Sequence, residues 1–282
     1  MNVLLVTLSI LIGAAPTLAV ATAADASGCE RSARYFWDQL SLSTVAMEPE
    51  GARRTIAQGV REAADRCPTT ERLAYVQVRV AELDADAERV AHGDAKRLSA
   101  ARLAADLFGR FPQSPLLGTV KARLDGTVEA ARQARVLGPT YVPAAVALAA
   151  ALVDSGDATE ALQVLGEAKD LSSVDDGFTV LARVKWALGD VNGAAAAAKK
   201  QLSGRKADRA EPGGGDLHAN AAAETLLAEV FLKKRQYEKA AGLLAEAEPY
   251  SGRARALIES ADLALQKAVV RARRPGPRPP IR

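Results

Sequence analysis

Among the residue types that can do chemistry, cysteine and histidine are the rarest in this sequence, with two of each. Cys29 and Cys67 are the only cysteines, and His92 and His218 are the only histidines. Neither histidine has a second His, a Cys or a paired acid beside it, as a metal site or a general base requires. The run Gly213–Gly215 lacks the Lys and Ser/Thr of a phosphate-binding loop. The sequence therefore predicts no catalytic residue, no metal site and no cofactor, and we expect a protein that is not an enzyme.

The two cysteines flank two expected helices, Glu30–Leu40 and Glu50–Arg66. In an antiparallel hairpin the start of the first helix lies beside the end of the second, so a Cys29–Cys67 disulfide is geometrically easy. In an oxidising compartment it would stabilise the fold by a few kcal/mol. Two alternatives stay open. Ala26–Cys29 faintly resembles a bacterial lipobox, which would make Cys29 the lipid anchor of an outer-membrane lipoprotein, and both thiols could instead be free.

The N-terminus has the pattern of a secretory signal peptide. An apolar run, Val3–Ala15, precedes a segment of small residues, Ala19–Ala24. We predict a signal peptide over residues 1–23, with Ala21–Ala23 as the cleavage site; an uncleaved anchor or a buried helix is the alternative. The run is shorter than the roughly 20 residues that a membrane span needs. We therefore expect an exported protein of the periplasm or cell envelope, without a transmembrane helix in the mature chain.

The composition favours helices. Hydrophobic residues make up 49% of the chain and aromatic residues only 4%, and the abundance of alanine and leucine suits closely packed helices better than sheets. Ala33, Phe36, Trp37 and Leu40 repeat at helical spacing. We expect an all-α fold that starts with helical hairpins over residues 29–112.

The net charge of +3 is unevenly distributed. Five arginines lie near the C-terminus, and the rest of the chain without them carries −2, so a basic nucleic-acid-binding surface over the fold is not expected. We predict that residues 273–282, rich in Arg and Pro, are disordered. They form either a solvated tail or a tether for peripheral association with an anionic envelope surface. The arginines are Arg271, Arg273, Arg274, Arg278 and Arg282.

One pattern occurs twice in the middle of the chain. Leu148–Ala149 stands seven residues before the turn Ser155–Asp157, and Leu181–Ala182 stands seven residues before the turn Leu188–Asp190. The offset between the two copies is 33 residues. A Gly-Asp pair ends one helix and caps the next. The pattern thus predicts a repeat of two helices.

Two further copies complete a resemblance to the tetratricopeptide-repeat (TPR) family, whose members repeat a small-residue pattern about every 34 residues. The Leu-Gly position of the family pattern corresponds here to Leu117–Gly118, Leu148–Ala149, Leu181–Ala182 and Leu227–Ala228, and a small residue follows 13 positions after each Leu, at Ala130, Ala161, Ala194 and Ala240. The chain resembles an exported bacterial TPR-like α-solenoid. The resemblance implies an α-α superhelix of stacked antiparallel helix hairpins, about 12–13 helices in all.

The resemblance also sets the expected boundaries. TPR-like repeats should cover residues 113–250, with an insertion loop over 203–216, where glycine, proline and charged residues accumulate. A single capping helix should follow over residues 251–272, because the last hairpin of a solenoid needs its apolar face covered.

The function implied by the resemblance is protein or peptide binding on the concave face. Transferring the family's concave positions by register gives Arg123, Asp154, Thr179, Arg183, Trp186, Glu229 and Lys233. They lack the Lys and Asn set that holds a peptide's C-terminal carboxylate in the chaperone-binding members. Trp186 has the alternative of packing in the core. We expect a scaffold or assembly factor of the bacterial envelope; the alternative is a structural envelope protein anchored through a lipidated Cys29 or the basic tail.

Overall fold

A computed structural model gives an all-α fold and describes residues 26–41, 50–92, 95–208, 217–261 and 263–272. The predicted signal peptide over 1–23 and the predicted tail over 273–282 lie outside the described residues, as does the side chain of Arg271. The described part contains fourteen α-helices and one short 3-10 helix. They are α1 (Ala26–Ser41), α2 (Glu50–Arg66), α3 (Glu71–His92), α4 (Ala95–Arg110), α5 (Pro115–Asp125), α6 (Val128–Leu137), α7 (Val142–Ser155), α8 (Ala158–Glu167), η1 (Leu171–Ser173), α9 (Gly177–Ala187), α10 (Val191–Asp208), α11 (Leu217–Lys233), α12 (Tyr237–Ala247), α13 (Gly252–Glu259) and α14 (Leu263–Ala272).

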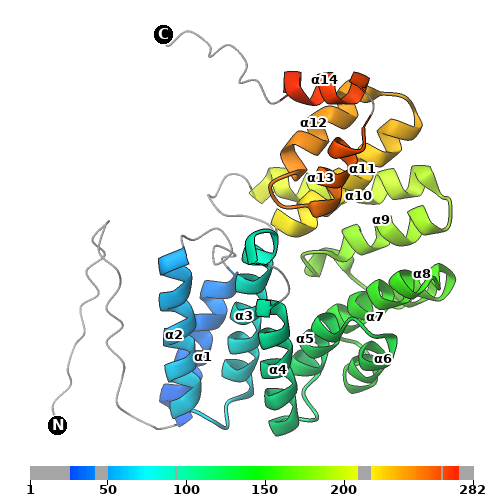
Figure 1. Ribbon diagram of the computed structural model, residues 1–282. Coiled ribbons are helices and arrows are strands. Elements are labelled where there is room, and N and C mark those ends of the chain that lie inside the picture. Colours follow the sequence, from blue (N-terminus) through cyan, green and yellow to red (C-terminus); the bar gives the residue numbers. More distant parts are fainter. Residues whose placement is uncertain (1–25, 42–49, 93–94, 209–216, 262, 273–282) are drawn as a thin grey trace.

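The helices follow one another along a curved stack, from α1 and α2 at one end to α14 at the other (Figure 1). From α2 to α12 each helix packs against the next, and α5, α7, α9 and α11 also pack against one another in that order. Short connections between packed neighbours make the pairs antiparallel. The predicted all-α superhelix of stacked helix hairpins is therefore confirmed.

The two predicted Gly-Asp turns are present. Gly156 ends α7 with a left-handed φ of 94°, and Asp157 accepts a 3.0 Å hydrogen bond from the Glu160 amide at the start of α8. Gly189 has a φ of 78°, and the carboxylate of Asp190 accepts a 2.8 Å bond from the Gly193 amide. Glycine adopts this backbone conformation without the steric cost that a Cβ would add. Each turn thus ends one helix and caps the next.

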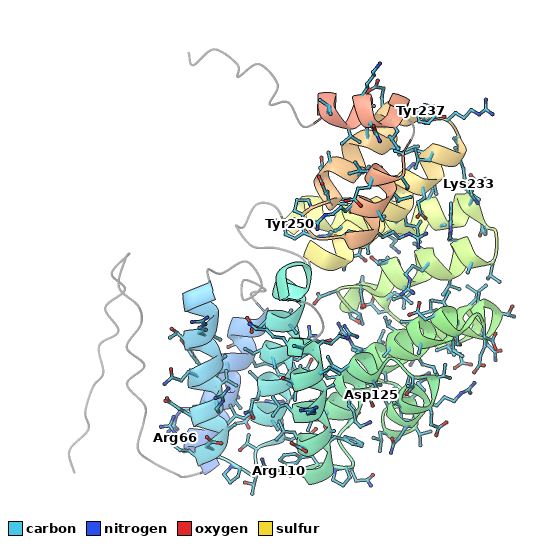
Figure 2. The ribbon with its side chains drawn as sticks, in the orientation of Figure 1. Arg66, Arg110, Asp125, Lys233, Tyr237 and Tyr250 are labelled. Atoms are coloured by element: carbon cyan, nitrogen blue, oxygen red, sulfur yellow. A yellow bond between two sulfur atoms is a disulfide. The ribbon has the colours of Figure 1, made fainter. Side chains whose placement is uncertain are left out.

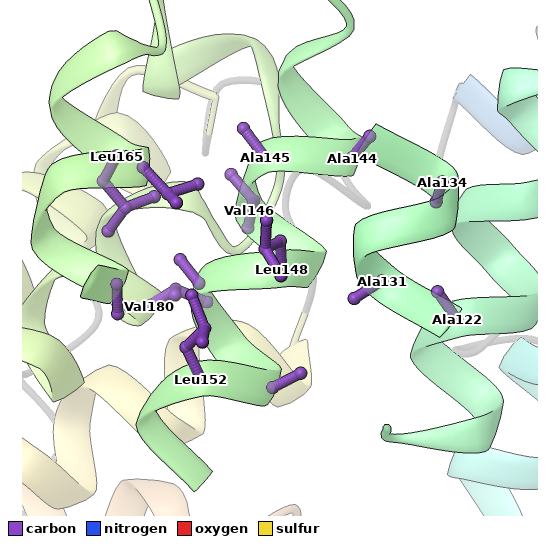
Figure 3. Close-up of a cluster of buried hydrophobic side chains, with 14 of the residues drawn as sticks. Ala122, Ala131, Ala134, Ala144, Ala145, Val146, Leu148, Leu152, Leu165 and Val180 are labelled. Carbon is purple, nitrogen blue, oxygen red and sulfur yellow. The ribbon is translucent and has the colours of Figure 1, made fainter. Parts of the chain in front are cut away.

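Alanine makes the close helix crossings of the stack. The small residues Ala161, Ala194 and Ala240 of the repeat are fully buried. Figure 3 shows the central cluster, in which Ala122 of α5 and Ala131 and Ala134 of α6 lie beside α7, the helix that carries Leu148 and Leu152. Small side chains let helix backbones approach closely, and the larger ones fill the space between successive hairpins. In these three copies, the small residue that follows 13 positions after the Leu of the repeat therefore marks a place where two helices pack closely.

Two predicted boundaries were wrong. The insertion does not begin at residue 203, because α10 continues to Asp208; once formed, an alanine-rich helix extends readily through good helix formers such as Arg205 and Lys206. The capping segment 251–272 is two helices, not one. α13 ends at Glu259, where the Ser260 hydroxyl donates to the Ala256 carbonyl at 2.8 Å, and such a bond competes with helix continuation.

The N-terminal helices are joined by a disulfide between Cys29 in the first turn of α1 and Cys67 directly after α2. The two Cα atoms are 5.6 Å apart. The bridge lies beside an apolar cluster formed by α1, α2 and α3, which includes Phe36, Val60 and Leu73. Of the alternatives open for the cysteines, the structure adopts the disulfide.

None of the helices within the described ranges combines the length and the apolar character needed to cross a membrane.

Candidate functional site

A cavity of about 710 Å³ lies on the concave side of the stack. Side chains of α3, α4, α5, α7, α9, α11 and α13 line it, and alanines such as Ala147, Ala150 and Ala222 form much of its wall. Tyr250, whose side chain is partly exposed, lies at its C-terminal side and points toward the inner side of the curve (Figure 2). The volume falls in the range of pockets that bind ligands. Small wall residues leave room for a bulky chain to enter.

Charged side chains surround this alanine wall. Arginines outnumber carboxylates among the residues that line the cavity. The five arginines are Arg97, Arg123, Arg183, Arg253 and Arg255, and the three carboxylates are Glu82, Asp154 and Asp176.

Three of the arginines form ion pairs that connect neighbouring helices of the concave wall. In each pair the arginine belongs to the later helix and the carboxylate to the earlier one. The pairs are Arg123 of α5 with Glu82 of α3 (Nε to Oε1, 3.3 Å), Arg183 of α9 with Asp154 of α7, and Arg253 of α13 with Glu229 of α11 (Nε to Oε1, 2.6 Å). Each pair fixes the position of a guanidinium beside the cavity.

The deepest of these pairs is part of a buried ionic cluster. Glu82 is 4% exposed and also bonds to Arg79 of its own helix. Burial alone would raise the pKa of Glu82, but the positive charges of Arg123 and Arg79 outweigh it and hold the pKa below its usual 4.5. Burial alone would likewise lower the pKa of Arg79, yet the attraction of Glu82 raises it. Both groups are therefore charged at neutral pH.

Four of the seven predicted binding residues line the cavity, and three do not. Glu229 lies next to it as the partner of Arg253. Lys233 and Trp186 contact each other elsewhere, with the ammonium nitrogen 4.1 Å from the ring centroid; Figure 2 shows Lys233 on the side of α11 away from Tyr250. The residues that line the cavity are Arg123, Asp154, Thr179 and Arg183.

The seven residues also differ in accessibility. Thr179 is buried, and its hydroxyl donates to the Ala219 carbonyl at 3.0 Å, so it connects α9 to α11. Trp186 is partly buried against the cluster that contains Ala182 and Leu227, which agrees with the alternative of core packing. Binding by any of these side chains stays a prediction.

Three cavity arginines were missed by the sequence reasoning. Arg97 comes from α4, in the N-terminal hairpins where the repeat pattern is not legible, and Arg253 and Arg255 come from α13, after the last copy. These three residues lie outside the four copies of the repeat pattern, so the pattern could not assign them to the concave face. A signal that could have located two of them is the spacing Arg253–Arg255 directly after the capping Ser251, which accepts from the Ala254 amide at 3.1 Å.

Within the part of the chain that the structure describes, no group of three or more His, Cys, Asp and Glu side chains is placed to hold a metal ion. Apart from Tyr250, the ionisable groups that line the cavity are arginines and carboxylates, several of which pair with one another. Such groups bind by charge and hydrogen bonding. The arrangement is suited to recognition of a ligand.

No protein-family model and no curated protein matches this sequence. Among solved structures, the chain is similar to one in the crystal structure of the APC/C hetero-tetramer Cut9-Hcn1, at 11% sequence identity and a TM-score of 0.46. The match covers 89% of this chain and 56% of the other, so the chain spans little more than half the length of that neighbour. The fold is established by the helix packing described above.

Proposed function

We propose that this protein is a non-catalytic scaffold that binds a protein or peptide in the concave cavity. The observation that carries the proposal is the construction of the cavity. Seven helices contribute to a wall of small residues on which ion pairs hold arginines in place. A ligand that touches all of these helices must be an extended one. A peptide segment fits this requirement, since its backbone can pass over alanines while its side chains meet the arginines.

We also propose that the protein works outside the cytoplasm, in the periplasm or cell envelope of a bacterium. The signal-peptide pattern over residues 1–23 supports export, and the Cys29–Cys67 disulfide supports it independently, because disulfides persist in oxidising compartments. A role as an assembly factor would be consistent with this location.

Site-specific photocrosslinking tests the binding proposal. A photoreactive amino acid is placed at Ala150 or Ala222 in the cavity, and as a matched control at Val136 of α6, which is 75% exposed and outside the cavity. Cells that express each variant are irradiated, and adducts are identified by mass spectrometry. We expect the same polypeptide to be crosslinked from both cavity positions and not from Val136. Identical adducts from all three positions, or none from the cavity, would contradict the proposal.

Mass spectrometry of the mature protein tests the proposed location. We expect an N-terminus close to residue 24 and a non-reduced peptide that joins Cys29 to Cys67. The mass of this peptide should split into two on reduction. An acylated Cys29 would replace the disulfide and would favour the anchored structural protein considered above, whereas an intact residue 1 would argue against export.

A further inference from the structure

We infer that the cavity recognises an acidic peptide segment, through carboxylates that bind Arg183, Arg253 and Arg255; this inference rests on the proposed function. The first support is the balance of charge. Five guanidinium groups and three carboxylates line the cavity, and a fourth carboxylate, that of Glu229, lies next to it as the partner of Arg253. Two of those carboxylates, Glu82 and Asp154, are already paired with cavity arginines. A basic ligand would have to compete with arginines for them.

The second support is the geometry of the hydrogen-bond donors. A guanidinium has five N–H donors in a planar fork that matches a carboxylate. Arg253 uses its Nε for Glu229, and its side chain is 70% exposed. Arg183 uses one Nη for Asp154 and is 36% exposed. Each therefore keeps terminal N–H groups for a ligand while its carboxylate partner holds it in place.

Arg255 differs from Arg183 and Arg253 in how its guanidinium is engaged. Its side chain lines the cavity and, among the residues that the structure describes, makes no ion pair. It stands two residues after Arg253 at the start of α13, across the concave wall from α5 and α7. A carboxylate of the ligand would give it the partner that α13 itself does not supply.

The wall between these arginines fits a peptide backbone better than a compact anion. Ala147 and Ala151 lie on α7, the helix between α5 and α9, and Ala219 lies on α11, which packs against α9. The cavity arginines lie on four helices, so a ligand that binds all of them must contact α4, α5, α9 and α13. Acidic side chains spaced along an extended chain can do so, because alternate residues of such a chain point to opposite sides.

Fluorescence anisotropy with three labelled peptides tests the inference on the full chain. The peptides share a Gly/Ser background of about ten residues and carry Glu, Gln or Lys at the same positions. We expect the Glu peptide to bind most tightly and its affinity to fall with added salt. Replacement of Arg183 or Arg255 by Gln should each weaken binding about tenfold, the usual effect of one charge-assisted hydrogen bond.

Arg132→Gln is the matched control. Arg132 is 49% exposed and pairs with Glu160 of the neighbouring hairpin at 2.6 Å, as Arg183 pairs with Asp154, but it lies outside the cavity. Its replacement should change the affinity less than twofold, and thermal unfolding followed by circular dichroism checks that all variants are folded.

The possible failures are distinguishable. Tighter binding of the Lys or Gln peptide, lost on Arg183→Gln, would overturn the acidic ligand and leave peptide binding in the cavity standing. Binding of the Glu peptide that all three variants leave unchanged, or binding of none of the peptides, would overturn the inference. In these two cases the crosslinking experiment decides separately whether the cavity binds another polypeptide.

Discussion

Replacing Glu82 by Gln is expected to lower the free energy of unfolding by about 3–5 kcal/mol, which is the usual loss when one partner of a buried ion pair is removed. The change keeps the size of the side chain but leaves Arg79, whose side chain is only 13% exposed, without its ion-pair partner on α3. It also removes the carboxylate that holds Arg123 beside the cavity. Urea unfolding followed by circular dichroism measures the effect.

The same variant should change the response to acid. The folded pKa of Glu82 lies below its unfolded value, so its contribution is complete above about pH 4.5 and is lost as the pH falls through the folded pKa. The stability curves of the wild type and Glu82→Gln should therefore converge in acid. Glu160→Gln is the control, because its pair with Arg132 is partly exposed and should contribute less than about 1 kcal/mol. Parallel curves down to the lowest pH would show that folding does not lower the pKa of Glu82.

Removing the disulfide is expected to have an effect of similar size. The bridge closes a loop across a sequence separation of 38 residues, for which the loss of chain entropy in the unfolded state corresponds to about 4 kcal/mol. The double variant Cys29→Ser with Cys67→Ser should unfold at a correspondingly lower urea concentration. Reduction of the wild type with dithiothreitol should reproduce the shift.

The double variant provides its own control, since dithiothreitol should leave its unfolding unchanged. Far-ultraviolet circular dichroism at low urea should remain helical, because α4 to α14 do not depend on the bridge for their packing. A shift smaller than about 1 kcal/mol in both the variant and the reduced wild type would mean that the apolar cluster of α1, α2 and α3 is sufficient to hold this end of the stack.

The central hairpins could be predicted from the sequence because their signals are local. Gly156 and Asp157 determine a helix end and a helix start within two residues, and the spacing of Ala161 from Leu148 follows from the close crossing of two consecutive helices. Because these features recur along the chain, the sequence also predicts which positions of α5, α7 and α9 lie on the concave face. Arg123, Asp154 and Arg183, which the register of the repeats assigns to the concave face, line the cavity.

The ion pairs of the cavity could not be predicted in the same way. Glu82 and Arg123 are far apart in sequence, and their contact depends on the rotation of α3 relative to α5. Lys233 does not line the cavity, because the register gives the helix and the face but not how far along the helix the cavity extends. The cavity borders the first part of α11, through Ala219 and Ala222, and Lys233 is at its last residue.

The position of the disulfide gives unfolding of the stack a direction. In an array where helices contact mainly their neighbours, opening begins at the ends. One end is covalently closed at α1 and α2, whereas no disulfide secures α14, which packs through Leu265, Ala268 and Val269. We therefore expect opening to proceed from α14 inward, so that α13, which carries two of the cavity arginines, detaches before the rest of the wall. A ligand that contacts both α5 and α13 would therefore stabilise the end of the stack that the disulfide does not secure.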